Sequence, residues 1–146
     1  YNLNYTSDKL LSLALQSGEY SRFRIDPNFR NNEFLKLYTE WINRSVSKEI
    51  ADEILVYNDN NSLQGFITLR IVNNIGSIGL IAVDELSRGR SVGKKLVSAA
   101  TSYFKSKNVT DVEVVTQLAN KSACSFYLSC GFKIKHIINI YHIWMK

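Results

Sequence analysis

The chain has 146 residues, of which 45% are hydrophobic and 21% are charged, and its formal net charge is +5. This composition excludes a disordered chain, and no apolar run is long enough to cross a bilayer. The basic residues do not alternate with aromatic residues along one face, so we expect neither a nucleic acid nor a membrane as a partner. We expect a single domain over residues 1–146 that works in the cytoplasm.

Two amphipathic helices are predicted in the N-terminal third of the chain. Apolar residues at helical spacing predict one helix from about Ser7 to Leu15 and a second helix over Phe34–Val46. Residues 17–27, which lie between them, contain a glycine and the single proline of the chain. Because both residue types interrupt regular structure, we expect a loop there.

The middle of the chain predicts three consecutive strands, over Glu53–Tyr57, Leu63–Val72 and Ser77–Val83. Asparagine-rich turns separate these strands and are typical of the connections in antiparallel hairpins. In the third strand, Gly79 is consistent with a β-bulge.

The last third of the chain predicts alternating helices and strands. We expect a helix over 91–105, a strand over 112–116, a short helix over 121–129 and one or two strands over Phe132–Lys146. The resulting ααβββαβαβ order predicts an α/β fold with a mixed central sheet flanked by helices.

Cys124 and Cys130 are the only cysteines, and they form no C-x-x-C motif. Since no histidine pair lies near them, the pattern predicts neither a disulfide framework nor a metal site. We expect both thiols to pack on or just after the short helix over 121–129.

The most informative segment is the turn between the third predicted strand and the helix that begins near Ser91. It carries four cations, Arg88, Arg90, Lys94 and Lys95. The first turn of a helix exposes unpaired N–H groups and a positive dipole end, so cations there are unfavourable unless an anion binds. Gly89 and Gly93 allow a ligand to approach the backbone closely, and a pyrophosphate suits this arrangement. The alternative is a basic turn exposed to solvent.

The segment Arg88-Gly89-Arg90-Ser91-Val92-Gly93 resembles the R/Q-x-x-G-x-G/A signature of the GNAT superfamily of N-acetyltransferases. In that family, this turn binds the pyrophosphate of coenzyme A through backbone amides. Ser91 replaces the usual glycine, and a serine can act as the N-cap of the helix. A second segment, from Asn120 to Phe132, resembles the family's N-x-x-A-x-x-x-Y-x-x-x-G-F pattern.

The resemblance implies a GNAT fold and an enzyme that moves an acetyl group from acetyl-CoA, its co-substrate, to a primary amine. It implies that Asn120 contacts the pantetheine arm, and that backbone N–H groups of the third strand receive the thioester carbonyl. The residues implied in acetyl-CoA binding are Ile81, Ala82, Val83, Arg88, Gly89, Arg90, Ser91, Val92, Gly93, Lys94 and Asn120.

The resemblance also implies that Tyr127 is catalytic and lies near the sulfur of coenzyme A. A phenol of pKa ~10 is a weaker acid than a thiol of pKa ~8.5, so we expect Tyr127 to stabilise the departing sulfur by a hydrogen bond. Glu113 or an ordered chain of waters is the expected general base. The alternative for Tyr127 is a residue that only packs in the core.

A further resemblance concerns the amine acceptor. Residues 13–26, together with aromatic residues of the second helix, resemble the dTDP-fucosamine acetyltransferases, which acetylate a 4-amino-4,6-dideoxyhexose linked to a nucleotide. The resemblance implies that Tyr20, Arg22 and Arg24 bind the substrate, because a nucleotide sugar offers a diphosphate and a base. Those enzymes carry an additional N-terminal region, so we expect part of the sugar site to lie outside residues 1–146.

Other functions remain open from the sequence. The acceptor can instead be a protein N-terminus, a polyamine or a small drug-like amine, and the chain can act alone or as a homodimer. A non-catalytic module that binds acyl-CoA would retain the cationic turn but would not need Tyr127.

Overall fold

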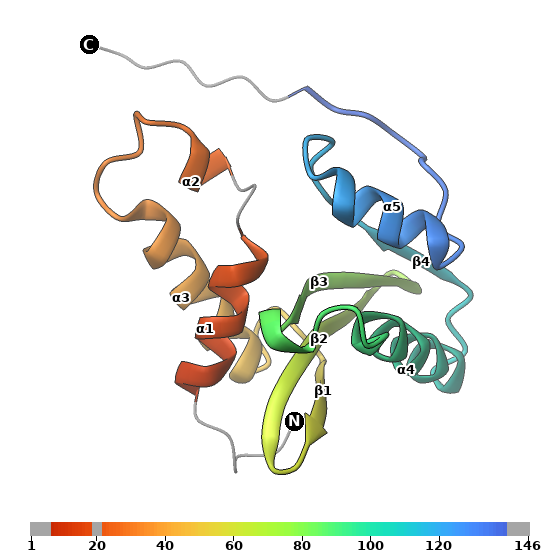
Figure 1. Ribbon diagram of the computed structural model, residues 1–146. Helices are drawn as coiled ribbons and strands as arrows, with labels where there is room; N and C mark the ends of the chain where they lie inside the picture. The colour runs from red at the N-terminus through yellow and green to blue at the C-terminus, as the bar shows by residue number, and fades with distance from the viewer. Residues whose placement is uncertain (1–6, 19–21, 140–146) are drawn as a thin grey trace.

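The computed structural model of the chain describes residues 7–18 and 22–139, in which helices flank a four-stranded sheet (Figure 1). In chain order, the elements are α1 (Ser7–Ser17), α2 (Arg22–Ile25), α3 (Glu33–Val46), β1 (Glu53–Asp59), β2 (Ser62–Val72), β3 (Ile75–Val83), a short 3₁₀ turn (Glu85–Ser87), α4 (Val92–Ser106), β4 (Asp111–Val114) and α5 (Lys121–Ser129). None of the helices in these ranges combines the length and apolar character that a membrane crossing needs.

The sheet has the order β1-β2-β3-β4 and is mixed, as the sequence predicted. The first three strands pair antiparallel, and β4 pairs parallel to β3. The two hairpin turns contain the pairs Asn60-Asn61 and Asn73-Asn74, whose φ angles are 50°, 60°, 52° and 61°. Two successive left-handed residues match the twist of antiparallel strands, and asparagine tolerates this conformation better than most residues.

A β-bulge interrupts β3 opposite Thr68 in β2. Ile67 pairs with Ile81 whereas Leu69 pairs with Ile78, so two residues of β3 lie across from one residue of β2. The Thr68 hydroxyl oxygen accepts a hydrogen bond from the Leu80 N–H at 2.9 Å. A Cβ atom on the other bulged residue, Gly79, would lie 2.7 Å from that oxygen, so glycine is required there. The bulge predicted at Gly79 is confirmed.

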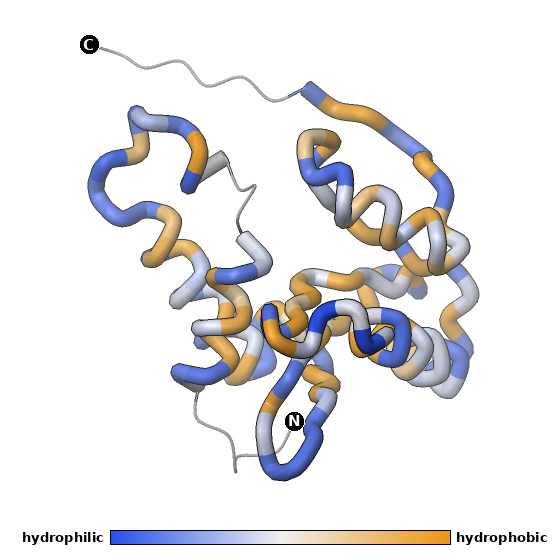
Figure 2. The backbone as a smooth tube through the Cα atoms, viewed as in Figure 1, coloured by the Kyte–Doolittle hydropathy of each residue, from blue (hydrophilic) through white to orange (hydrophobic). Residues whose placement is uncertain are grey.

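The sheet buries apolar side chains on both of its faces. On one face, α1 and α3 contribute Leu10, Leu13 and Ile42, which pack against Phe66 and Leu80. On the other face, α4 contributes its own apolar stripe, and the members of this core include Val92, Leu96, Ala100 and Phe104. The hydropathy of the chain agrees with this arrangement, because the tip of the β1–β2 hairpin, which lies away from both cores, is hydrophilic (Figure 2).

Two predictions of secondary structure are wrong, one for a strand and one for a loop. Residues 132–139 form no strand, so the strand expected to begin at Phe132 is absent there, and residues 140–146 lie outside the described part of the chain. The expected loop over residues 17–27 contains the short helix α2. Alternating apolar residues alone did not produce a strand after Phe132, because a strand also needs a neighbour with which to pair its backbone.

Candidate functional site

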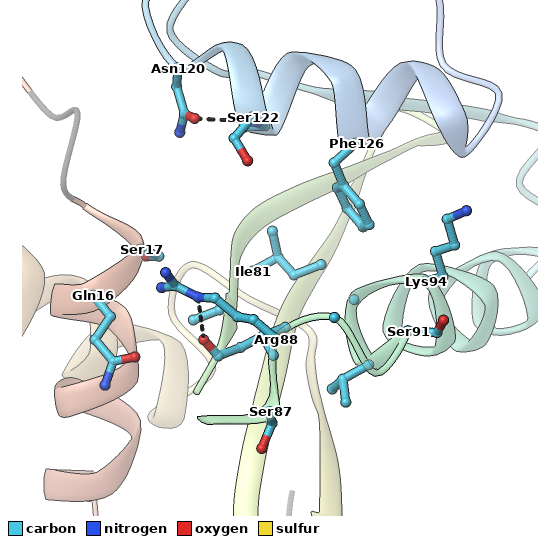
Figure 3. Close-up of a pocket in the computed structure, with 16 residues that line it drawn as sticks. Gln16, Ser17, Ile81, Ser87, Arg88, Ser91, Lys94, Asn120, Ser122 and Phe126 are labelled. Carbon is cyan, nitrogen blue, oxygen red and sulfur yellow. Dashed lines mark hydrogen bonds between the residues drawn. The ribbon is translucent and has the colours of Figure 1, made fainter. Parts of the chain in front are cut away.

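A cleft of about 620 Å³ lies between the end of α1, the end of β3, the start of α4 and the start of α5 (Figure 3). It exists because β3 and β4 part: their pairing stops at Ile78 and Val114, whereas β3 continues to Val83. Most of the residues that the sequence implied in acetyl-CoA binding line this cleft, namely Ile81, Ala82, Val83, Arg88, Gly89, Ser91, Val92, Gly93, Lys94 and Asn120.

The start of α4 forms one wall of the cleft. Ser91 occupies the N-cap position with φ 61°, a left-handed conformation, and its side chain makes no capping hydrogen bond. The expected capping role of the Ser91 hydroxyl is therefore wrong. The first-turn N–H groups, including those of Val92 and Gly93, have no carbonyl of the preceding turn to bind, so they are available to an anion.

Two glycines shape this wall in different ways. Gly89 has a φ of 79°, and no atom lies within 4 Å of the position of its missing Cβ. The left-handed backbone therefore accounts for this glycine. At Gly93, a Cβ would lie 3.1 Å from the ring of Phe126, which extends from α5 into the cleft (Figure 3). Gly93 thus allows α5 to approach the start of α4.

The cations of the turn do not all face the cleft. Lys94 and Arg88 line it, and the side chain of Arg88 extends toward α1 while its Nε donates a 3.4 Å hydrogen bond to the carbonyl of Val83 (Figure 3). Arg90 is exposed and does not line the cleft. Lys95 contacts Tyr57 instead, with its Nζ 3.3 Å from the phenol oxygen and 5.1 Å from the ring centre.

Asp84 connects the turn to α1. One carboxylate oxygen accepts a hydrogen bond from the Leu86 N–H at 3.1 Å, and the other accepts one from Lys9 Nζ at 3.2 Å. The backbone hydrogen bond from Leu86 is the main cause that lowers the pKa of Asp84, and Lys9 lowers it further against the opposing effect of burial. The carboxylate therefore holds α1 beside the end of β3.

Asn120 and Tyr127 lie on α5 but in different surroundings. The Asn120 side-chain oxygen accepts a hydrogen bond from the Ala123 N–H at 3.0 Å, which caps the helix, and the same residue lines the cleft. Tyr127 is only 7% exposed, does not line the cleft, and packs edge-on against Phe132 with ring centres 5.6 Å apart. Burial, and to a lesser extent Cys130, raises the pKa of Tyr127 to about 12.

Of the other candidates, the described residues Glu113 and Arg24 do not line the cleft. Glu113 is exposed on β4, where it pairs with Ser77, and it does not line the cleft. Tyr20 and the side chain of Arg22 lie outside the described part of the chain. Arg24 is exposed, and its guanidinium lies 5.3 Å from the centre of the Phe34 ring.

The cleft also contains residues that were not among the predicted site residues, namely Gln16, Ser17, Ser87, Ser122, Ala123 and Phe126. A signal for Gln16 and Ser17 was present in the sequence. They follow the buried residues Leu13 and Ala14 at helical spacing, so the apolar stripe of α1 becomes polar at its last turn. No comparable signal existed for Phe126, which the second signature leaves unspecified.

Comparisons with known proteins identify the family of the chain. The model of the acetyltransferase (GNAT) family matches residues 14–132. An uncharacterized N-acetyltransferase of Methanocaldococcus jannaschii is 29% identical over 110 residues, which are 70% of this chain and 49% of the relative. The chain thus spans about half the length of this curated relative.

Solved structures with a similar fold include two acetyltransferases that were determined with a form of coenzyme A bound. The PaiA N-acetyltransferase of Thermoplasma acidophilum, in complex with coenzyme A, aligns with a TM-score of 0.70 at 22% identity over 88% of this chain and 84% of that one. A putative streptothricin acetyltransferase of Bacillus anthracis, in complex with acetyl coenzyme A, is 37% identical over 53% of this chain and 45% of that one, with a TM-score of 0.52. Because the family model covers most of the chain, the chain belongs to the GNAT family of acetyltransferases.

Proposed function

We propose that this chain transfers an acetyl group from acetyl-CoA to a primary amine. The observation that carries the proposal is the cleft itself, in which unpaired N–H groups at the start of α4 lie beside Arg88 and Lys94. Such an arrangement binds a diphosphate through both backbone amides and charge. The similarity to the Bacillus anthracis structure, which contains acetyl coenzyme A, supports the same ligand.

In this proposal, the pantetheine arm follows β3 past Asn120, where β4 no longer pairs with β3. Alternate N–H groups of an antiparallel strand point away from its partner, so β3 offers donors on its open edge between Gly79 and Val83. The thioester carbonyl accepts one of these hydrogen bonds. When the neutral amine attacks the carbonyl carbon, the same donor stabilises the oxyanion that forms. The C–S bond then breaks, coenzyme A leaves as a thiolate, and the nitrogen passes its extra proton to water, the expected base that remains because Glu113 does not line the cleft.

Tyr127 donates a hydrogen bond to the departing sulfur in this proposal. Its pKa of about 12 lies well above that of a thiol, ~8.5, so complete proton transfer would be unfavourable by about 5 kcal/mol. A hydrogen bond that strengthens as charge develops on sulfur avoids this cost. The role requires the thiol to reach the phenol past Phe126, because Tyr127 does not line the cleft.

We further propose a dTDP-linked 4-amino-4,6-dideoxyhexose as the acceptor, with Tyr20, Arg22 and Arg24 at its nucleotide. The support is the sequence of residues 13–26, which leads from the α1 wall of the cleft into α2. The structure has a short helix at Arg22–Ile25, within the segment where the sequence predicted a loop. A small drug-like amine is the second candidate, and the similarity to a putative streptothricin acetyltransferase favours it.

The proposed enzyme acts in the cytoplasm on small molecules, without nucleic acid or membrane as a partner. A homodimer is part of the proposal, because several large apolar side chains are exposed, namely Val115, Leu118, Ile134, Ile137 and Ile138. Apolar surface of this kind is often covered in an assembly. Light scattering that gives twice the mass of the chain would support the dimer, and a monomer at high concentration would contradict it.

The function is tested by incubating the chain with acetyl-CoA and a panel of amines while free thiol is measured. The panel contains the dTDP-linked amino sugar, glucosamine, spermidine, streptothricin and a peptide with a free N-terminus. We expect thiol release that depends on one class of amine. Binding of acetyl-CoA without turnover of any amine would instead indicate a non-catalytic acyl-CoA-binding module.

A further inference from the structure

The last turn of α1 places a polar wall on the cleft opposite the start of α4. Leu13 and Ala14 are fully buried, and the residues three positions after them, Gln16 and Ser17, line the cleft. The Ser17 hydroxyl donates a 2.6 Å hydrogen bond to the Ala14 carbonyl, so its donor is used within the helix. Gln16 therefore supplies the free polar group of this wall.

The side-chain oxygen of Gln16 is buried, yet no donor in residues 7–18 or 22–139 forms a hydrogen bond with it. An unpaired buried acceptor is unfavourable, and native proteins leave few of them. Figure 3 shows Gln16 on the last turn of α1, with the guanidinium of Arg88 extending toward this helix, and Gln16 is among the residues that line the cleft. An acceptor that is buried, unpaired and located at a cleft is explained if a ligand supplies the missing donor.

The position of Gln16 indicates which ligand this is. It lies across from the end of β3, on the side of the cleft away from the α4 turn that the proposed function assigns to the diphosphate. The ion pair between Lys9 and Asp84 holds α1 at this place. The thioester presents a carbonyl oxygen and a sulfur to the β3 edge, and neither atom can donate a hydrogen bond to Gln16. The pantetheine amides do carry N–H groups, so the Kd for acetyl-CoA has to be measured beside the KM for the amine.

We infer that the Gln16 side-chain oxygen accepts a hydrogen bond from the attacking amine and so positions the acceptor substrate beside β3. The inference rests on the proposed function and adds a residue that binds the acceptor. The hydrogen bond holds one N–H of the amine and leaves the nitrogen lone pair free to attack the thioester carbon. Any acceptor must carry this N–H, whatever the rest of the molecule is.

Gln16→Met tests the inference, because methionine has a similar length and no hydrogen-bonding oxygen. Two effects are expected: the free protein becomes more stable, and it binds the amine more weakly. The melting temperature of the free protein rises by about 2 °C or more, since an unpaired buried acceptor is removed. The KM for the amine that the wild-type protein acetylates best in the panel rises about 3- to 10-fold, the range of one lost hydrogen bond. The Kd for acetyl-CoA stays within about 2-fold of wild type.

Ser12→Ala is the matched control, because Ser12 is exposed on the same helix and does not line the cleft. It should leave the KM unchanged, and it should alter the melting temperature only by the helix propensity of alanine over serine, about 0.5 kcal/mol or less. A lower melting temperature in Gln16→Met would overturn the inference, because it would show that Gln16 makes a structural bond. An unchanged amine KM would overturn it equally. A wild-type protein that acetylates no amine would refute the proposed function, and this inference with it, before any variant is measured.

Discussion

Among the described residues, Tyr127 has the pKa that its surroundings shift most clearly. The residue is 7% exposed, and burial raises the pKa of its phenol to about 12. The phenol therefore stays protonated throughout the range in which an enzyme of this kind can be assayed. It remains a hydrogen-bond donor there and contributes no ionisation of its own.

Tyr127→Phe should reduce kcat by about 10- to 100-fold, the lower range for loss of a catalytic donor. The Kd for acetyl-CoA should change little, because the hydroxyl acts on the leaving sulfur. The pH profile below about pH 10 should keep its shape and lose only amplitude, since no limb belongs to a group of such high pKa. Steady-state kinetics over that range measure this, and turnover equal to wild type would reduce Tyr127 to a packing residue.

Ser91 occupies a backbone position where a side chain is unfavourable, because its φ is 61°. Ser91→Gly should therefore stabilise the protein by about 0.5–1 kcal/mol, and raise its melting temperature by roughly 2–4 °C, without weakening acetyl-CoA binding. Ser102→Gly is the control, because Ser102 lies within α4, where replacing serine by glycine should destabilise by about 0.5 kcal/mol. Equal effects of the two changes in thermal melts would contradict the proposed role of backbone conformation.

The residues of the turn illustrate what the sequence could predict. The signature indicated the positions of Gly89 and Gly93, and most of its residues do line the cleft. It could not distinguish Lys94, which faces the cleft, from Lys95, which lies against Tyr57. That difference arises from the helical rotation of about 100° between neighbouring residues and from the position of β1, which spacing in the sequence does not reveal.

At the level of elements, the link between α1 and the turn depends on Asp84. Its folded-state pKa is below the ordinary value of 3.8, so its contribution to stability is complete above that pH and is lost as the pH falls below it. The melting temperature of Asp84→Asn should thus be lower than that of wild type near neutral pH, and the gap should close in acid. Thermal melts between about pH 7 and about pH 3 measure the gap, and a gap independent of pH would contradict this account.

The strands show why some elements were predictable and others were not. The asparagine pairs and alternating residues of β1 to β3 are local signals, and each strand has its partner next to it in the chain. The bulge at Gly79 was signalled by glycine alone, although its fixation by Thr68 depends on the neighbouring strand. The expected strand after Phe132 does not form over residues 132–139, and the strand that precedes it in the chain, β4, is separated from it by α5.

At the level of the whole molecule, the cleft combines residues that are distant in the sequence. Gln16, Ala82, Gly93 and Asn120 meet because α1 covers one face of the sheet, α4 covers the other, and β4 parts from β3 between them. The two signatures predicted the β3, α4 and α5 sides of this cleft. They could not predict the α1 side, because it is set by long-range packing of Leu10 and Leu13.

The central claim is that the diphosphate of acetyl-CoA binds at the start of α4. Calorimetric titration of acetyl-CoA into wild type, Arg88→Ala and Arg90→Ala tests it, because both changes remove one charge from the same turn and only Arg88 lines the cleft. We expect one site per chain, a loss of about 10-fold or more in affinity for Arg88→Ala, less than about 2-fold for Arg90→Ala, and weaker binding at higher salt. No binding by the wild type, or equal affinity in wild type and Arg88→Ala, would contradict the claim.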